Sequence, residues 1–204
     1  MIKEKYKAVV LLSGGIDSTV ALVKMIKRVG KDQVLCLIID YQQKQRIREL
    51  KAAWQIAQYY EVDYMDLEVR MPNRLNDKDA YLPGRNAVFL SLACAWAEHF
   101  GAEMVSFGAN NDDYQNYPDC RVEWITSFIE QLNSSEMKVR VVYDLLNMSK
   151  AGVIAYGKEL GVPFELTWSC YNHGAEPCGE CDACKLRAEA FKKSDTYLED
   201  KSEI

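Results

Sequence analysis

The stretch Ser13-Gly14-Gly15-Ile16-Asp17-Ser18 sets two glycines, two hydroxyls and a carboxylate directly after a run of apolar residues. A Ser-Gly-Gly turn that enters a helix offers free backbone N–H groups and the positive end of a helix dipole, and both attract anions. Asp17 would repel a phosphate, so a nucleotide here requires Mg²⁺ as well. The stretch predicts a loop that holds the phosphates of ATP, called the phosphate loop (residues 13–18) below. The alternative is a strand-to-helix turn in which Asp17 and Ser18 cap the helix.

The phosphate loop lacks the GxxxxGK[ST] arrangement, so no lysine is placed over a γ-phosphate. That argues against a kinase or an ATPase that cleaves the γ-phosphate. The string resembles the SGGxDS loop of the ATP-pyrophosphatase (adenylating) superfamily, whose members split ATP between the α and β phosphates. The resemblance implies that ATP and Mg²⁺ are bound by the loop and its neighbours, namely Leu12, Ser13, Gly14, Gly15, Asp17, Ser18 and Thr19.

Four cysteines near the end of the chain follow the spacing C-x7-C-x2-C-x2-C: Cys170, Cys178, Cys181 and Cys184. Four thiolates satisfy a tetrahedral Zn²⁺ and leave no open coordination position, so the pattern predicts a structural zinc site. Iron–sulfur ligation is the main alternative, because CxxCxxC spacing also occurs in ferredoxin-like sequences. His173 lies between the ligands and offers a substitute for one of them. The metal is expected to hold the C-terminal segment, with its helix Asp182–Lys193, against the rest of the chain.

The other three cysteines have no such spacing. Cys36 falls in an expected strand and Cys94 in an apolar helix, where cysteines usually act as small core residues. Cys120 stands between Asp119 and Arg121. A neighbouring cation lowers the pKa of a thiol, so a nucleophilic role is an alternative for Cys120.

Three further segments concentrate polar residues: Tyr81–Asn86, Gly108–Arg121 and Met148–Gly152. Arg85 starts a buried helix, where a lone guanidinium needs an anion or an acid. Ser149 is expected to cap a helix, and Lys150 in its first turn is poorly placed for the dipole, so an external anion is its expected partner. Long polar loops such as 108–121 are usually functional when they occur in compact domains.

Strands and helices are expected to alternate along the chain. The predicted strands are Lys7–Leu12, Val34–Ile39, Val62–Val69, Glu103–Gly108 and Val139–Tyr143; the predicted helices are Ser18–Val29, Gln45–Tyr60, Asn86–Phe100, Val122–Leu132 and Lys150–Leu160. This alternation predicts an α/β fold with a doubly wound, mostly parallel sheet. Ligands bind such sheets beyond the carboxyl ends of the strands, which is where the phosphate loop and residues 108–121 fall.

The composition of the 204-residue chain is that of an ordinary globular protein, with 49% hydrophobic and 27% charged residues. The organisation expected is an α/β domain over residues 1–166 and a zinc-binding segment over 167–204. A net charge of −5 argues against non-specific nucleic-acid binding. The charged start of the chain, Met1–Lys7, and the short apolar run after it predict neither a signal peptide nor a membrane span, and we expect a cytoplasmic protein.

Five segments in order resemble the 7-cyano-7-deazaguanine synthase family of queuosine and deazapurine biosynthesis: YLPGRN, NYPDCR, SKAG, TWSCYN and PCGECDAC. The resemblance implies an adenine nucleotide α-hydrolase-like fold and a C–N ligase that converts 7-carboxy-7-deazaguanine and ammonia, with ATP, to 7-cyano-7-deazaguanine. It also implies a homodimer. Its candidate catalytic residues are Asp17, Arg85 and Lys150, and its candidate substrate-binding residues are Arg85, Asn86, Asp113, Tyr117, Asp119 and Arg121.

The sequence departs from the family around the substrate edge. Gln45 stands where a histidine is expected, Gln115-Asn116 replaces a Ser-Gly pair, and the connection from Glu68 to Asp79 is short. These departures keep three alternatives open: an adenylating enzyme that stops at the amide or uses another carboxylate, a tRNA-modifying relative, and a non-catalytic zinc module. No glutaminase domain fits in the chain, so free ammonia or a partner protein is expected to supply nitrogen.

Overall fold

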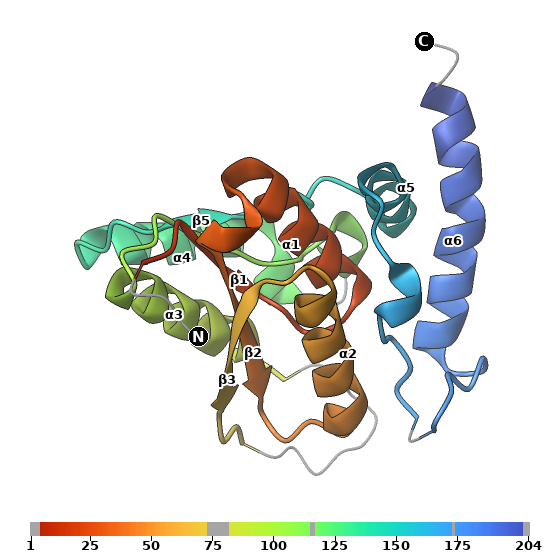
Figure 1. The fold of residues 1–204 in the computed structure, drawn as a ribbon, viewed down its shortest axis with the longest axis horizontal. Helices are drawn as coiled ribbons and strands as arrows, with labels where there is room; N and C mark the ends of the chain where they lie inside the picture. The colour runs from red at the N-terminus through yellow and green to blue at the C-terminus, as the bar shows by residue number, and fades with distance from the viewer. Residues whose placement is uncertain (1–4, 73–81, 115–116, 173, 202–204) are drawn as a thin grey trace.

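The computed structural model describes residues 5–72, 82–114, 117–172 and 174–201. Its centre is a parallel five-stranded sheet in the order β3-β2-β1-β4-β5 (Figure 1). The strands are β1 (Ala8–Leu11), β2 (Val34–Asp40), β3 (Asp63–Glu68), β4 (Met104–Ser106) and β5 (Arg140–Val142). The expected doubly wound, parallel α/β fold is therefore confirmed.

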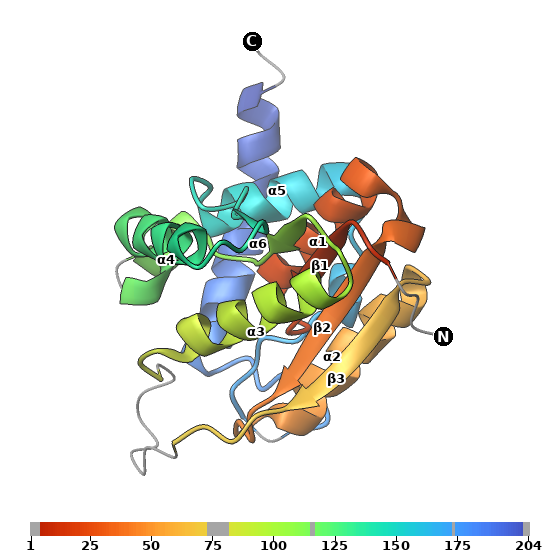
Figure 2. The same cartoon turned by 90° about the vertical axis from the view of Figure 1, so that its left-hand side faces the viewer.

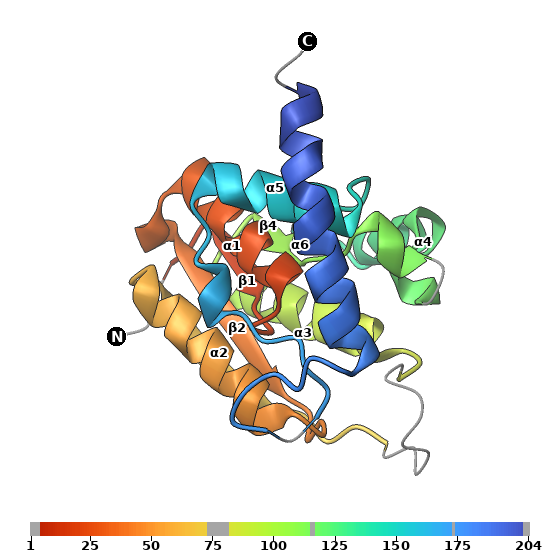
Figure 3. The same ribbon diagram turned by 90° about the vertical axis from the view of Figure 1, so that its right-hand side faces the viewer.

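Helices cover both faces of the sheet (Figures 2 and 3). One face packs against α1 (Ile16–Val29) and α2 (Arg46–Tyr59), and the other against α3 (Arg85–His99) and α4 (Val122–Ser134). On the outside of α1 lies α5 (Lys150–Leu160), and α6 (Asp182–Lys201) packs on α5 and extends beyond the body of the protein (Figure 1).

The central strands are apolar without alternation because both of their faces are buried. In β1, Val9 faces the α3 side and packs in the cluster with Leu35, whereas Val10 faces the α1 and α2 side with Cys36. All four side chains are fully buried. The edge strand β3, with four half-buried and two exposed residues, has the mixed polar and apolar sequence DYMDLE. The weaker apolar signal of this strand reflects its place at the edge of the sheet.

Several boundaries differ from the expectations. Helix α1 begins at Ile16, and its N-cap is Gly15 with no side-chain cap bond. Asp17 and Ser18 therefore lie inside the first turn, and the alternative in which they cap the helix is wrong. Short 3₁₀ helices that the sequence pattern did not reveal occupy residues 31–33, 111–114, 118–120 and 164–166.

Some sequence predictions fall outside the described residues: the role of His173, the Gln115-Asn116 pair and the end of the 68–79 connection. Within the part of the chain that the structure describes, no helix combines the length and apolar character needed to cross a membrane.

Candidate nucleotide and metal sites

The phosphate loop lies at the point where the sheet changes winding direction. The chain runs from β1 outward through β2 and β3, then returns to place β4 on the other side of β1. The carboxyl ends of β1 and β4 are thus neighbours, and this crevice is the usual ligand site of doubly wound sheets. Gly108, just after β4, lies so close to the start of α1 that a Cβ there would be 2.5 Å from the Asp17 carbonyl carbon. The fold therefore packs the polar loop after β4 directly against the phosphate loop.

The phosphate loop is shaped by its own glycines and hydroxyls. Gly14 has φ +81°, and a Cβ there would be 2.6 Å from the Glu49 carbonyl oxygen on α2, so a larger residue is excluded. Ser18 Oγ accepts from the Ser13 backbone N–H at 3.2 Å and donates to the Gly15 carbonyl at 3.1 Å. Thr19 Oγ1 donates to the same carbonyl at 2.7 Å. Ser18 and Thr19 are both buried, and their hydroxyls bond within the loop.

Asp17 is the centre of a group of charged side chains. Its Oδ2 forms an ion pair with Lys150 Nζ from the start of α5, and its Oδ1 accepts from Asn110 Nδ2 at 3.1 Å. The expectation that Lys150 would require an external anion is corrected: its partner is a carboxylate of the chain itself. Ser149 does cap α5, accepting from the Gly152 N–H at 3.2 Å.

Asn110 joins Asp17 to a second carboxylate. Its side-chain amide also donates to Asp113 Oδ2 at 2.9 Å, and its Oδ1 accepts from the Asp112 N–H at 2.8 Å. Asn110 is itself only 1% exposed. One buried amide thus holds two carboxylates that would otherwise repel each other.

These contacts shift two pKa values. Burial raises the pKa of Asp113 to about 6, and the negative charge of Asp17 adds to the shift. For Lys150, burial is the largest single influence and opposes the charge, but Asp17, Asp113 and Asp112 together outweigh it and raise the lysine pKa above its ordinary value. Lys150 therefore keeps its positive charge near neutral pH.

A second polar group surrounds the start of α3. Asp119 is 3% exposed, and its Oδ2 accepts from the Asn86 backbone N–H at 3.4 Å. Its Oδ1 has no hydrogen-bond partner among the described residues. Arg85 donates to the Tyr41 hydroxyl at 3.3 Å, and its guanidinium carbon is 5.8 Å from the Tyr41 ring centroid. The start of α3 thus places Arg85 and Asn86 beside Asp119.

Other candidates from the loop after β4 lie in different surroundings. Arg121 Nε donates to the Tyr114 carbonyl at 3.1 Å, and the guanidinium lies over the Tyr114 ring. The Tyr117 N–H donates to the Asp113 carbonyl at 2.8 Å. Burial raises the pKa of Cys120 to about 12, although Arg85 acts in the opposite direction. The expectation that a neighbouring cation, Arg121, lowers the pKa of the Cys120 thiol is therefore wrong, because burial dominates and the cation that opposes it is Arg85.

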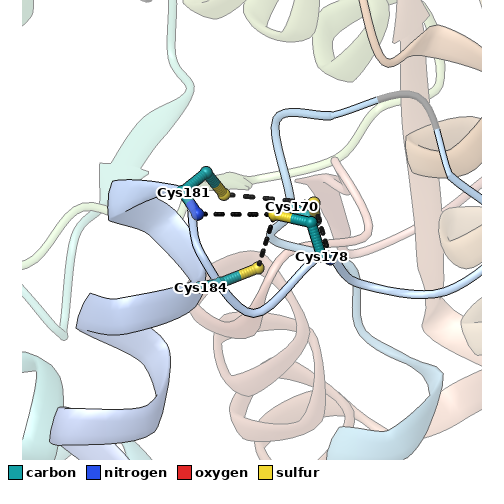
Figure 4. Close-up of side chains that lie close together, drawn as sticks. All are labelled: Cys170, Cys178, Cys181 and Cys184. Carbon is teal, nitrogen blue, oxygen red and sulfur yellow. Dashed lines mark hydrogen bonds between the residues drawn. The ribbon is translucent and has the colours of Figure 1, made fainter.

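The four cysteines with metal-ligand spacing converge (Figure 4). All four sulfurs lie within 4.8 Å of one another, with Cys178 to Cys184 at 4.0 Å and Cys181 to Cys170 at 3.9 Å. Cys184 belongs to the first turn of α6, and the other three lie on the preceding loop. We call this group the four-cysteine site; its geometry suits a bound metal ion.

Backbone N–H groups support the sulfurs. The N–H groups of Cys181 and Glu180 donate to Cys178 Sγ at 3.3 and 3.4 Å, and those hydrogen bonds lower the pKa of Cys178 to about 6. The N–H of Cys178 in turn donates to Cys170 Sγ at 3.4 Å. Donors directed at sulfur favour the thiolate form that metals bind. All seven cysteines of the chain are free thiols, and Cys36 and Cys94 lie in the core as expected.

Sequence reasoning missed two residues that the structure places at these sites. In the sequence, Asn110 is one polar residue among several in the segment 108–121. Tyr41 belongs to the segment 41–45, which differs from the family pattern. A signal for Asn110 existed, since an amide two residues after the Gly108 turn follows a strand at the ligand edge. Tyr41 has no comparable signal, because its partner Arg85 is 44 residues away in sequence.

Comparisons with known proteins identify the family. The family model described as "Queuosine biosynthesis protein QueC" matches residues 7–80 and 76–195. A 7-cyano-7-deazaguanine synthase from Campylobacter curvus is 38% identical, covering 92% of this chain and 94% of that protein. Another from Thermoplasma acidophilum is 38% identical, covering 94% of this chain and 90% of that protein. Both relatives carry the name of an enzyme.

Solved structures share the fold at much lower identity. The U34-tRNA thiolase NcsA from Methanococcus maripaludis with its [4Fe-4S] cluster has a TM-score of 0.55 at 17% identity, covering 97% of this chain and 68% of that one. The NMN synthetase from Francisella tularensis has a TM-score of 0.54 at 16% identity, covering 95% and 77%. They show an adenine nucleotide α-hydrolase-like fold. With the family model spanning nearly all of it, the chain belongs to the QueC family of queuosine biosynthesis proteins.

Proposed function

We propose that the protein converts 7-carboxy-7-deazaguanine and ammonia to 7-cyano-7-deazaguanine with ATP. The observation that carries this proposal is the similarity to proteins of that name over more than 90% of the chain. The phosphate loop at the switch point of the sheet supports the use of ATP, because backbone N–H groups and a helix N-terminus there suit a phosphate.

The chemistry explains why ATP is needed. A carboxylate is a weak electrophile, and oxide is not a viable leaving group. Attack of the carboxylate on the α-phosphorus forms an acyl adenylate and releases diphosphate; ammonia then displaces AMP to give the amide. A second adenylation, on the amide oxygen, again releases diphosphate, and loss of AMP and two protons leaves the nitrile. Lys150 and Arg85 supply positive charge that stabilises the transition states.

The residues divide between the two polar groups. Ser13, Gly14 and Gly15 present the phosphate loop, and Asp17 is the ligand for Mg²⁺, which screens the charge of the nucleotide. Leu12, Ser18 and Thr19 hold the loop in shape from buried positions. The heterocycle is recognised by the group at α3, where the free Oδ1 of Asp119 accepts from its ring N–H groups. Asn86, Asp113, Tyr117 and Arg121 complete the substrate-binding set.

Zinc is the metal we propose for the four-cysteine site. Tetrahedral zinc with Zn–S bonds of about 2.3 Å separates its sulfurs by about 3.8 Å. The separations of 3.9 and 4.0 Å match that value. In a cubane iron–sulfur cluster each thiolate binds a different iron, which sets the sulfurs farther apart. Zinc with four protein ligands supplies stability and no open position for catalysis. The homodimer, the cytoplasmic location and the external source of ammonia remain parts of this proposal.

Product analysis tests the function. Purified protein is incubated with 7-carboxy-7-deazaguanine, ATP, Mg²⁺ and ammonium, and the products are separated by mass. The nitrile, together with AMP and diphosphate, is the expected result. Amide alone assigns an enzyme that stops after the first nitrogen transfer, and no conversion of this acid contradicts the substrate. Release of ADP and phosphate contradicts adenylation itself.

A further inference from the structure

Trp168 forms one hydrogen bond to the phosphate loop and another to the four-cysteine site. Its backbone N–H donates to the Gly14 carbonyl oxygen at 2.9 Å. Its indole Nε1–H donates to the Cys170 carbonyl oxygen at 2.8 Å. Trp168 thus contacts both the phosphate loop and the four-cysteine site, which are more than 150 residues apart in sequence.

The bond from the Trp168 N–H to the Gly14 carbonyl sets the direction of the Gly15 N–H. A peptide unit is planar and trans, so its C=O and N–H point in opposite directions. With the Gly14 carbonyl bound to Trp168, the N–H of Gly15 is directed away from Trp168 and donates to Ser13 Oγ at 3.4 Å on the exposed side of the loop. Gly14 has φ +81° and no side chain, so its own sequence restricts this peptide weakly. The Trp168 bond therefore fixes a donor of the proposed phosphate site.

The segment that carries Trp168 is held from the metal side. Cys170 is the first metal ligand, and Cys184 lies at the start of α6. From the same helix, Arg187 donates to Thr167 Oγ1 at 2.8 Å, Ser169 Oγ at 3.2 Å and the Phe164 carbonyl at 2.7 Å. A metal ion bound by Cys170 and Cys184 would connect the segment that carries Trp168 to helix α6.

Two contacts from α2 complete the position of the segment. Arg48 lies over the Trp168 ring, with its guanidinium carbon 5.7 Å from the centroid. Gln45 Nε2 donates to the Tyr171 carbonyl at 2.7 Å, one residue after the first metal ligand. The indole is therefore held between the phosphate-loop side and the metal side of the molecule.

We propose that Trp168 is a positioning residue that couples metal binding at the four-cysteine site to the orientation of the Gly14–Gly15 peptide. Metal ligation fixes Cys170; the Cys170 carbonyl fixes the indole; and the Trp168 backbone N–H then holds the Gly14 carbonyl. The inference deepens the proposed function, since the peptide it positions belongs to the proposed phosphate site.

Hydrogen–deuterium exchange of the phosphate loop tests this coupling without any nucleotide. Wild-type protein and Trp168→Phe are compared in saturating zinc. Phenylalanine keeps the backbone N–H and most of the ring but lacks the indole donor. Loss of one hydrogen bond, about 1 kcal/mol, corresponds to exchange about fivefold faster in the peptide that contains Gly14 and Gly15. The matched control is Trp54→Phe, which removes an indole bond of 2.7 Å from the half-buried Trp54 on α2 to the exposed Asp66 on β3; it leaves loop exchange unchanged.

Metal removal supplies the second comparison. Chelation accelerates loop exchange in wild-type protein and has a clearly smaller effect in Trp168→Phe, where the connection is already broken. Wild-type exchange in the zinc-loaded variant, or equal acceleration by chelation in both proteins, would overturn the coupling.

Binding of a non-hydrolysable ATP analogue with Mg²⁺, measured by calorimetry, separates this inference from the function on which it rests. Weaker binding by Trp168→Phe, with Trp54→Phe unchanged, supports both. If wild-type protein binds no nucleotide, the proposed function fails, and the exchange data alone then decide the coupling.

Discussion

The four-cysteine site directs backbone N–H groups toward sulfur, and we propose that the phosphate loop offers them to a nucleotide, but the two regions gain their geometry in different ways. The phosphate loop lies between β1 and α1, and both α2 and the turn after β4 pack closely against this region. The four-cysteine site lies at the edge of the molecule, where N–H···S bonds, the start of α6 and side-chain bonds from Trp168 and Gln45 hold its loop. The fold thus encloses the first site on several sides, whereas we expect a bound metal ion to contribute most of the stability of the second.

The largest expected effect concerns the charged pair at the phosphate loop. Asp17→Asn removes the charge that pairs with Lys150 and that we assign to Mg²⁺, so we expect turnover to fall by about 10²–10³-fold. Diphosphate release under saturating ATP measures it. Asp144→Asn is the matched control, because Asp144 also pairs with a lysine, Lys24 at 3.3 Å, but on the surface. Full activity of Asp17→Asn would remove the carboxylate from the mechanism.

The metal site should respond mainly in stability. Cys178→Ser removes one of four ligands, and we expect loss of the bound metal ion with a decrease in Tm of roughly 5–10 °C, which corresponds to about 2–3 kcal/mol. Metal analysis and thermal unfolding measure the two effects. Cys94→Ala, which shortens a core cysteine far from the ligand group, keeps its metal. An unchanged metal content in Cys178→Ser would contradict the assignment of Cys178 as a ligand. It would also remove the expected difference between the two sites in their dependence on a metal ion.

The smallest effect concerns the pH dependence of stability. Asp113 has a folded-state pKa of about 6 against an ordinary value of 3.8, so the folded protein binds this proton more tightly than the unfolded chain. The resulting stability is present below pH 3.8 and is lost as the pH rises through about 6. We expect the wild-type protein to lose roughly 1–2 kcal/mol of its free energy of unfolding between pH 4 and pH 7 through this group, after allowance for partial exposure. Asp113→Asn should not show that loss.

Urea unfolding at both pH values measures that difference. Asp66→Asn, which changes an exposed carboxylate on β3, serves as control and keeps the wild-type pH dependence. If Asp113→Asn loses as much stability with rising pH as the wild-type protein does, another group causes the change. The buried amide of Asn110 would then hold Asp113 without altering its protonation.

Local sequence pattern was sufficient to locate the glycine-rich turn and the cysteine cluster and to give the order of strands and helices. Glycines and an acid after a buried strand, and cysteines two residues apart, restrict the backbone within a few residues, so their meaning can be read without the fold. Helix α5, predicted over Lys150–Leu160, has those bounds in the structure. The edge strand and the 3₁₀ helices were harder, because their limits depend on neighbours distant in sequence.

Only the tertiary structure decided which side chains meet. Lys150 pairs with Asp17 across 133 residues, and Trp168 reaches Gly14 across a similar span. Neither contact follows from local spacing, because the position of β4 beside β1 and the docking of the C-terminal segment create them. The sequence determined that a phosphate loop and a metal-binding segment exist. Their connection depends on packing, since a hydrogen bond requires both groups to be brought within about 3 Å.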